Sequence, residues 1–215
     1  MLLPRYSPSD ITEKKVLLRL DLDVADNDLR LERASTTIKE LLNFNAKAVV
    51  ICGHRGRPEG KYDPALSLRP IKDRLEILLN KLGVQDKINF ITEIKPVPDS
   101  LPGRLMMLEN LRFWSGEKNN DSKFAAALAQ WGEAYVNDAF GACHRGDASL
   151  AAITIVIKEY FAGPNLAQEM QEQEKFMANT GAGLVVVLGG IKISTKLPLI
   201  KNLLPKASAI LLGGG

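Results

Sequence analysis

Charged and histidine side chains gather in four short stretches of this sequence, each following an apolar run. The stretches are RLDLD (19–23), GHRGRP (53–58), LENLRF (108–113) and NDAFGACHR (137–145). The planar guanidinium of arginine binds a carboxylate or phosphate through two parallel hydrogen bonds. If the stretches meet in space, they form a positive basin for a small phosphorylated carboxylic acid. The candidates for this basin are Arg57, Arg112, Arg145, His54 and His144.

Each stretch stands where a buried strand is expected to end. Residues 48–53 are apolar without alternation, as in parallel strands that are covered on both faces. In open α/β sheets, ligands bind in the crevice outside the carboxyl ends of the strands. The alternative is that the basic residues lie on solvated loops and bind nothing. In that case polar or basic residues would follow four successive strands by chance.

Strands and helices alternate through the first 148 residues. Apolar residues recur at three- and four-residue steps from Leu68 to Leu82, so we expect a helix there with Ser67 as its cap and Pro70 in its first turn. The alternation predicts an α/β fold, a doubly wound parallel sheet of Rossmann-like type. The other expected helices are 34–44 and one from Asp121, and the expected strands are 14–23, 48–53, 88–91, 104–110 and 133–138. Core or near-core packing is expected for Met106, Met107, Trp114 and Trp131.

The pattern changes after residue 148. SLAAITIVIKEYFAG (149–163) fits either a helix or a strand, and 164–179 fits an exposed helix that connects two domains. Residues 184–215 predict strand, glycine-rich turn, helix and strand. A single unit of this kind cannot cover its own apolar faces, so we expect a truncated second α/β domain. The predicted division is 1–162, the connecting helix 163–180, and 181–215.

Composition excludes several classes of protein. There are 28 basic and 25 acidic residues, and the basic ones are scattered without interleaved aromatics, so a nucleic-acid partner is not expected. Cys52 and Cys143 are too few for a disulfide framework or a zinc site. No apolar run has the length of a signal peptide or a membrane span, so we expect a cytoplasmic protein with no membrane partner. A thiol enzyme built on Cys143 and His144 is a weaker alternative to a packed cysteine.

The motifs, in this order, resemble those of phosphoglycerate kinase. The resemblance runs from about Lys15 to the last residue and rests on GHRGRP, LENLRF, YVNDAFG, HR followed by AS, and GGIKISTK. It implies a first lobe that binds 3-phosphoglycerate or its acyl phosphate, and a second that binds ADP or ATP with Mg²⁺. The implied glycolytic reaction moves a phosphoryl group reversibly between 1,3-bisphosphoglycerate and ADP, in an enzyme that is typically monomeric.

The resemblance also implies roles for particular residues. Phosphoryl transfer depends on positioning and on neutralising charge, which arginine, lysine and magnesium provide. Catalytic roles fall to Arg30 and Lys192, with Arg33 a weaker candidate than Arg30, and no side chain of this chain is implied as a metal ligand. The implied substrate-binding residues are Asp21, Asp23, Arg30, His54, Arg57, Arg112 and Arg145. The implied nucleotide-binding residues are Gly189, Gly190, Lys192, Lys196, Gly213 and Gly214.

The sequence departs from the family pattern at several of these motifs. Asp23 replaces the usual asparagine and brings a carboxylate beside an anionic substrate, and Arg55 replaces the usual leucine. We hypothesise that Arg55 offsets the charge of Asp23. The other departures are Ala25 for proline, Asp147 for a common histidine, and Thr195 for the aspartate before the second lysine.

Three functions stay open on the sequence alone. The favoured one is a phosphoglycerate kinase represented by its first lobe and the start of its second, inactive in this form. A second is a non-catalytic remnant that keeps an anion or phosphoglycerate pocket. A third is another doubly wound protein whose arginines lie on the surface, in which case charge reversal at Arg57 and Arg112 leaves ligand binding unchanged.

Overall fold

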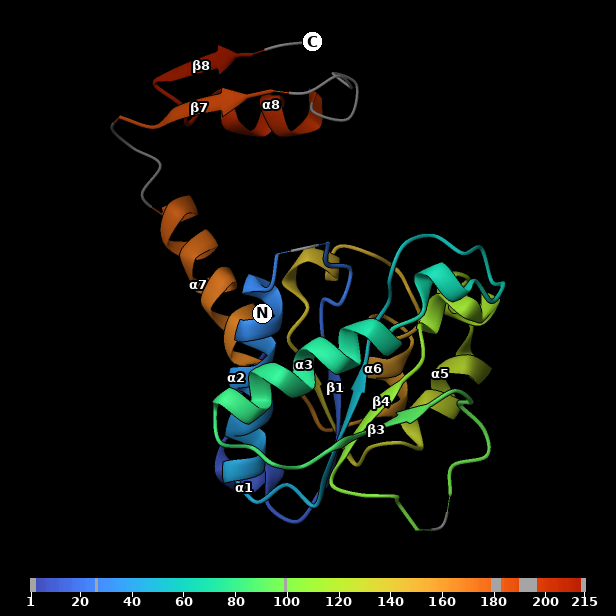
Figure 1. Ribbon diagram of the computed structural model, residues 1–215. Helices are drawn as coiled ribbons and strands as arrows, with labels where there is room; N and C mark the ends of the chain where they lie inside the picture. The colour runs from blue at the N-terminus through green and yellow to red at the C-terminus, as the bar shows by residue number, and fades with distance from the viewer. Residues whose placement is uncertain (1–2, 26, 99, 179–182, 190–196, 214–215) are drawn as a thin grey trace. The chain divides into compact units, whose positions relative to one another are not determined.

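The chain forms two compact units, Met1–Gln168 and Glu169–Gly215. A computed structural model describes residues 3–25, 27–98, 100–178, 183–189 and 197–213 (Figure 1). Lys192, Lys196, Gly190, Gly214 and Thr195 lie outside these ranges. Helix α7 (Pro164–Ala178) crosses the boundary between the units. Its expected role as a domain connector, and the predicted domain limits, stay predictions.

The first unit is built on one six-stranded sheet in which every neighbouring pair is parallel. The order across the sheet is β3-β4-β2-β1-β5-β6. The predicted α/β fold with a doubly wound parallel sheet is confirmed. The strands are β1 (Lys15–Arg19), β2 (Ala48–Cys52), β3 (Ile88–Ile91), β4 (Leu105–Leu108), β5 (Ala134–Asn137) and β6 (Tyr160–Ala162).

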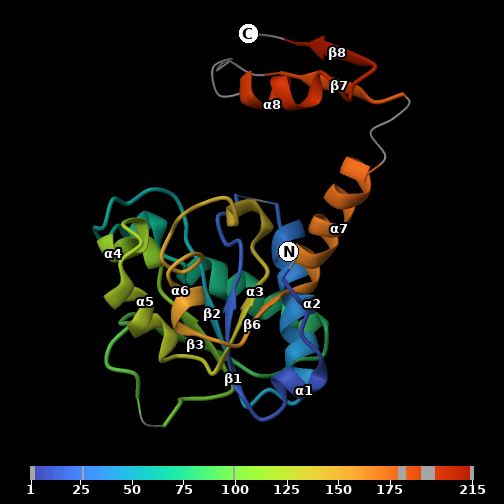
Figure 2. The ribbon, with the colours of Figure 1, turned by 180° about the vertical axis from the view of Figure 1, so that it is seen from behind.

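Helices cover both faces of this sheet, as Figures 1 and 2 show from opposite sides. The α1, α2 and α3 side chains pack with Val16 and Leu18 of β1 on one face. The α5 and α6 side chains pack with Leu17 of β1 on the other face. Alternate residues of one strand therefore enter different cores, which explains why the strands are apolar throughout. The helices are α1 (Pro8–Ile11), α2 (Leu29–Asn43), α3 (Arg69–Lys81), α4 (Ser115–Lys118), α5 (Ser122–Ala129) and α6 (Ile153–Val156).

Three single turns of 3-10 helix complete the first unit. They are η1 (Pro64–Leu66), η2 (Leu111–Phe113) and η3 (Phe140–Ala142). Two of them, η2 and η3, directly follow strands β4 and β5. They therefore form part of the edge where the polar stretches lie.

The first strand is shorter than predicted. Residues 14–23 were expected as one strand, but β1 ends at Arg19. Leu20 and Leu22 remain fully buried beyond that point, so the apolar alternation continues after the backbone has left the sheet. Leu22 packs over Gly53. A Cβ added at Gly53 would lie 2.7 Å from the Cδ1 atom of Leu22. Side-chain burial, not strand pairing, produced the misleading pattern.

Two helices begin at other residues than expected. Helix α2 starts at Leu29 rather than at 34. Its first turn carries charged residues, which interrupt the apolar pattern from which the start was predicted. Asn27 Oδ1 accepts a hydrogen bond from the Leu29 backbone N–H at 2.8 Å. Helix α3 has Leu68 as its cap by backbone conformation. Ser67, the predicted cap, still accepts from the Arg69 N–H at 3.2 Å.

The ambiguous segment 149–163 contains a helix and then a strand, α6 and β6. Both expectations were therefore right for part of it. The predicted core is confirmed for Met106, Met107 and Trp131, which are at most 1% exposed, whereas Trp114 is only partly buried.

The second unit holds the predicted strand, helix and strand. These are β7 (Val185–Leu188), α8 (Leu197–Leu203) and β8 (Ala209–Leu212), and the two strands pair in parallel. Several of its apolar side chains are exposed, including Val187 at 71% and Leu212 at 76%. Among the described residues of the whole chain, no helix is long and apolar enough to cross a membrane.

Candidate anion-binding site

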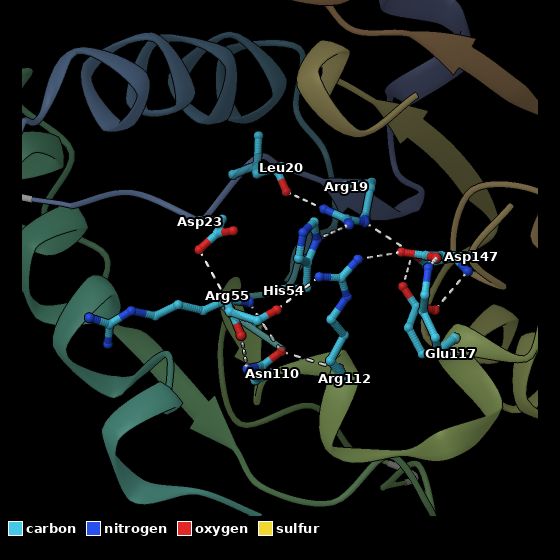
Figure 3. Close-up of polar contacts among 12 residues, drawn as sticks. Arg19, Leu20, Asp23, His54, Arg55, Asn110, Arg112, Glu117 and Asp147 are labelled. Carbon is cyan, nitrogen blue, oxygen red and sulfur yellow. Dashed lines mark hydrogen bonds and ion pairs between the residues drawn. The ribbon is translucent and has the colours of Figure 1, made fainter. Parts of the chain in front are cut away.

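The four polar stretches meet at the carboxyl-end edge of the sheet. The strands that carry them, β4, β2, β1 and β5, are consecutive neighbours, so their following loops lie side by side. Contacts join all four loops, and Figure 3 shows the polar groups converging there. The convergence expected from the sequence is therefore present.

A buried arginine holds the histidine of this cluster. Arg19 Nη2 contacts His54 Nδ1 at 2.7 Å, and both side chains are at most 1% exposed. Arginine can only donate, so His54 Nδ1 accepts and the ring proton sits on Nε2. Burial, and then the charges of Arg19, Arg112 and Arg145, lower the pKa of His54 to about 2. His54 is therefore a neutral residue whose buried Nε2–H has no partner among the described residues.

Arg112 also lies in the buried part of the cluster. Its Nη2 forms an ion pair with Asp147 Oδ2 at 3.0 Å, and its Nη1 donates to the Gly56 carbonyl at 2.8 Å. Its Nε is buried without a partner in the described part of the chain. Lys118 Nζ contacts Asp147 Oδ1 at 3.1 Å. Burial alone raises the pKa of Asp147, but hydrogen bonds from Arg112 and Lys118 outweigh it and hold that pKa below its usual value.

Asn110 ties the loop after β4 to the loop after β2. Its Oδ1 accepts from the backbone N–H groups of Arg112 at 3.1 Å and Arg55 at 3.2 Å. Its Nδ2 donates to the carbonyls of Arg55 at 2.8 Å and Leu66 at 2.9 Å. Asn110 is fully buried, so these bonds fix where the side chain of Arg112 begins.

Gly56 joins two predicted site residues through its backbone. Its N–H donates to Asp23 Oδ1 at 3.0 Å, and its carbonyl accepts from Arg112. Its φ is +60°, in the left-handed region that glycine adopts without strain, and an added Cβ would lie 2.6 Å from Leu66 Cδ2. Only glycine fits this position without a shift.

Asp21 and Arg30 lie together beside this loop. Arg30 Nη1 is 3.3 Å from Asp21 Oδ2 and donates to the Asp23 carbonyl at 3.3 Å. Arg30 is 60% exposed, so it borders the cluster from the solvent side. An open hollow of about 510 Å³ lies here, lined by Asp23, Val24, Ala25, Asn27, Leu29, Arg30 and Arg33.

The hypothesis that Arg55 offsets Asp23 is wrong. The Arg55 guanidinium donates to the carbonyls of Ala65 at 3.2 Å and Ser67 at 3.3 Å. Figure 3 shows it pointing away from Asp23. Ala65 lies in η1 and Ser67 precedes α3, so both carbonyl oxygens stand outside the hydrogen-bond ladder of that helix and can accept from the cation. Asp23 is instead satisfied by a backbone N–H.

The remaining basic candidates lie nearer the solvent. Arg57 is exposed and has no partner among the residues that the structure describes. Arg145 is half-buried and close enough to His54 to lower its pKa. His144 is exposed and makes no described contact with the cluster. Cys143 is exposed, so the packed cysteine expected from the sequence is wrong. What burial its side chain has raises the pKa of the thiol, which disfavours the reactive thiolate that a thiol enzyme needs.

Besides Asn110, sequence reasoning missed Arg19, Ser149 and Glu117, which are also buried in this cluster. Arg19 Nε donates to Ser149 Oγ at 3.0 Å, and Ser149 Oγ donates to Glu117 Oε1 at 2.6 Å. Burial raises the pKa of Glu117, although Arg19 and Ser149 oppose that shift. One signal was present: a charged residue inside the apolar run VLLRL needs buried partners.

For the expected nucleotide site, the structure describes only Gly189 and Gly213. Gly213 N–H donates to the Leu188 carbonyl at 2.8 Å, so the ends of β7 and β8 are adjacent. Within the described ranges, no group of three or more His, Cys, Asp or Glu side chains could hold a metal ion.

The comparisons with known proteins agree with one another. The family model described as phosphoglycerate kinase matches residues 7–215. This chain belongs to the phosphoglycerate kinase family. Curated phosphoglycerate kinases from Geotalea uraniireducens and Desulfovibrio desulfuricans are 39% and 40% identical to it, each over 96% of the chain.

Solved phosphoglycerate kinase structures have the same fold. The enzyme from Coxiella burnetii superposes with a TM-score of 0.83 at 36% identity, and that from Pyrococcus horikoshii with 0.82 at 26% identity. Each match covers 99% of this chain and 55% of the solved chain. The two curated relatives are covered over 54% and 53% of their length. The chain therefore spans about half the length of the phosphoglycerate kinases that it matches.

Proposed function

We propose that the first unit binds 3-phosphoglycerate, or the acyl phosphate derived from it, at the carboxyl ends of β4, β2, β1 and β5. One observation carries the proposal: two buried N–H donors, His54 Nε2 and Arg112 Nε, have no partner among the described residues and belong to a cluster that also holds Arg145. A buried donor without a partner costs free energy, so a ligand that supplies an acceptor there is favoured. A phosphate or carboxylate oxygen is such an acceptor.

Each predicted substrate residue has a role in this proposal. Neutral His54 donates a hydrogen bond through Nε2, and Arg57, Arg112 and Arg145 supply the positive charge. Asp21 and Asp23 accept hydrogen bonds from the ligand's hydroxyl group. Arg30, on the solvent side, stabilises the transferring phosphoryl group, as electrostatic neutralisation is the main demand of this chemistry.

The reaction of the whole enzyme is reversible phosphoryl transfer between 1,3-bisphosphoglycerate and ADP, giving 3-phosphoglycerate and ATP. We propose that the nucleotide binds at the second unit, near Gly189, Gly190, Lys192, Lys196, Gly213 and Gly214, with Lys192 taking the catalytic role. Mg²⁺ belongs to this proposal as the ion that neutralises nucleotide phosphate charge. We also propose that the protein is cytoplasmic and monomeric.

Calorimetric titration of 3-phosphoglycerate into the 215-residue chain tests the substrate site. We expect saturable binding that weakens with added salt. Arg57→Ala should weaken it about tenfold or more, since it removes an exposed charge that no described residue neutralises. Circular dichroism checks that the variant is folded. Binding that is unchanged in Arg57→Ala, or no binding by the folded wild-type chain, contradicts the site.

A further inference from the structure

Asp147 places a carboxylate inside the candidate anion site. Its side chain is 1% exposed, and its two oxygens contact Arg112 Nη2 at 3.0 Å and Lys118 Nζ at 3.1 Å. It comes from the loop after β5, whereas Arg112 lies in η2 after β4 (Figure 3). The ion pair therefore joins two of the four loops that form the site.

The buried charges of the cluster are already balanced without a ligand. Two arginines, Arg19 and Arg112, face two carboxyl groups, Glu117 and Asp147, and all four side chains are at most 6% exposed. An anionic ligand that contacts Arg112 adds negative charge beside a buried carboxylate. Charges of one sign repel strongly where water is excluded.

Arg112 does not depend on Asp147 alone for its orientation. Its Nη1 donates to the Gly56 carbonyl at 2.8 Å, and its backbone N–H donates to Asn110 Oδ1 at 3.1 Å. Its Nε has no partner among the described residues. Removing the charge of Asp147 therefore leaves Arg112 held at two points, with more of its positive charge available.

We propose that Asp147 acts as an internal counter-ion that competes with the anionic ligand for Arg112 and so lowers the affinity of the site. This inference rests on the proposed function, because it needs an anion at Arg112. It assigns Asp147 as the residue that sets how tightly phosphoglycerate binds. Lys118, which is 66% exposed, partly compensates the carboxylate from the solvent side.

The test compares 3-phosphoglycerate binding by the wild-type chain, Asp147→Asn and Glu117→Gln. Asparagine keeps an oxygen acceptor for Arg112 but carries no charge, so we expect Asp147→Asn to bind about tenfold more tightly, with a steeper dependence on salt. Glu117→Gln is the matched control, since it neutralises a carboxyl group equally buried but bonded to Ser149. We expect it to change affinity by less than about twofold.

A double variant shows whether the effect passes through Arg112. When Arg112→Gln is already present, Asp147→Asn should give no gain in affinity, because the guanidinium for which Asp147 and the ligand compete is absent. Equal or weaker binding by Asp147→Asn, or an equal gain in Glu117→Gln, overturns the proposal. If Asp147→Asn does not fold, Asp147→Ser is subject to the same criteria.

The outcomes separate this inference from the function beneath it. Wild-type binding that is lost in Arg57→Ala, together with no gain in Asp147→Asn, rejects the counter-ion alone. No binding by any folded variant rejects the proposed function and the counter-ion together. Binding by Asp147→Asn where the wild type shows none supports both.

Discussion

The pair of Arg19 and His54 decides the chemistry of the candidate site at the scale of single residues. A histidine beside three arginines suggests a further positive charge when only the sequence is considered. The geometry gives the opposite result, because Arg19 donates to Nδ1 and burial removes the solvent that would stabilise a charged ring. His54 therefore contributes a directed hydrogen bond, and the arginines alone contribute charge.

This arrangement predicts a pH dependence of stability. The pKa of His54 is about 2 in the folded chain and about 6.5 when unfolded, so the unfolded chain binds a proton that the folded chain does not. Stability attributable to His54 is thus fully present above pH ~6.5 and falls by ~1.4 kcal/mol per pH unit below it. Urea unfolding between pH 5 and pH 8, followed by the fluorescence of buried Trp131, measures this slope.

His54→Gln is the matched variant for that measurement. Glutamine can accept from Arg19 and cannot titrate, so its free energy of unfolding should fall less steeply with acid than that of the wild type. Identical slopes in the two proteins would show that the pKa of His54 is the same in the folded and the unfolded chain.

At the scale of elements, the start of α7 depends on one buried carboxylate. Asp138 Oδ1 accepts from the backbone N–H groups of Asn165 at 2.8 Å and Leu166 at 3.1 Å. Its Oδ2 accepts from Thr37 Oγ1 at 2.6 Å and Asn165 Nδ2 at 2.6 Å. Asp138 follows β5 directly, so one side chain connects a strand end, helix α2 and helix α7.

We expect Asp138→Asn to lower the free energy of unfolding of the first unit by ~2–3 kcal/mol, because an amide group would face donors that need an acceptor. Thr37→Val removes one donor and keeps the carboxylate, so its cost should be smaller, ~1 kcal/mol. Chemical denaturation of both variants measures these losses. Equal losses would mean that the helix amides do not rely on Asp138.

Strands were predicted well where the buried residues are also the residues that pair in the sheet, and poorly where buried residues continue beyond the paired ones. The run at 48–53 pairs and is buried throughout, so β2 was found almost to the residue. Leu20 and Leu22 are buried but lie beyond the end of β1, so the predicted strand extended too far. The first turn of α2 contains Arg30 and Glu32, whose charges hid the helix start.

The candidate site was predicted from its basic side chains more than from the polar groups that hold them in place. Arg112 and His54 were found because basic residues after strands indicate an anion. Asn110 and Ser149 were missed, because their hydrogen bonds join loops far apart in sequence and leave no local pattern. Arg55 was assigned a partner by charge alone, and carbonyl oxygens of a neighbouring turn attract it instead.

At the scale of the whole chain, the two units differ in how their sheets are covered. Both faces of the six-stranded sheet are packed by helices, whereas β7 and β8 expose Val185 at 53%, Val187 at 71%, Leu211 at 55% and Leu212 at 76%. A two-stranded sheet with exposed apolar side chains has little independent stability. The second unit should therefore open without unfolding of the first.

Amide hydrogen exchange tests this difference. We expect the amides of β7 and β8 to exchange at least about 100 times faster than those of β1 and β2, which lie in the centre of the large sheet. The central strands serve as the internal control. Equal protection in both sheets would mean that another surface covers β7 and β8 in solution.

Arg19 has a further consequence for how such a protein can diverge. It is in register with Cys52 of β2 and Asn137 of β5, in the last row of the sheet before the loops begin. That row is at once the end of the core and the floor of the anion site, so a substitution there changes packing and recognition together. Asp147, in the loop after β5, lies outside that row and contacts Arg112 directly. We expect inherited differences in substrate affinity among such chains to accumulate in the loops that follow the strands, while the last row of the sheet stays fixed by selection for folding.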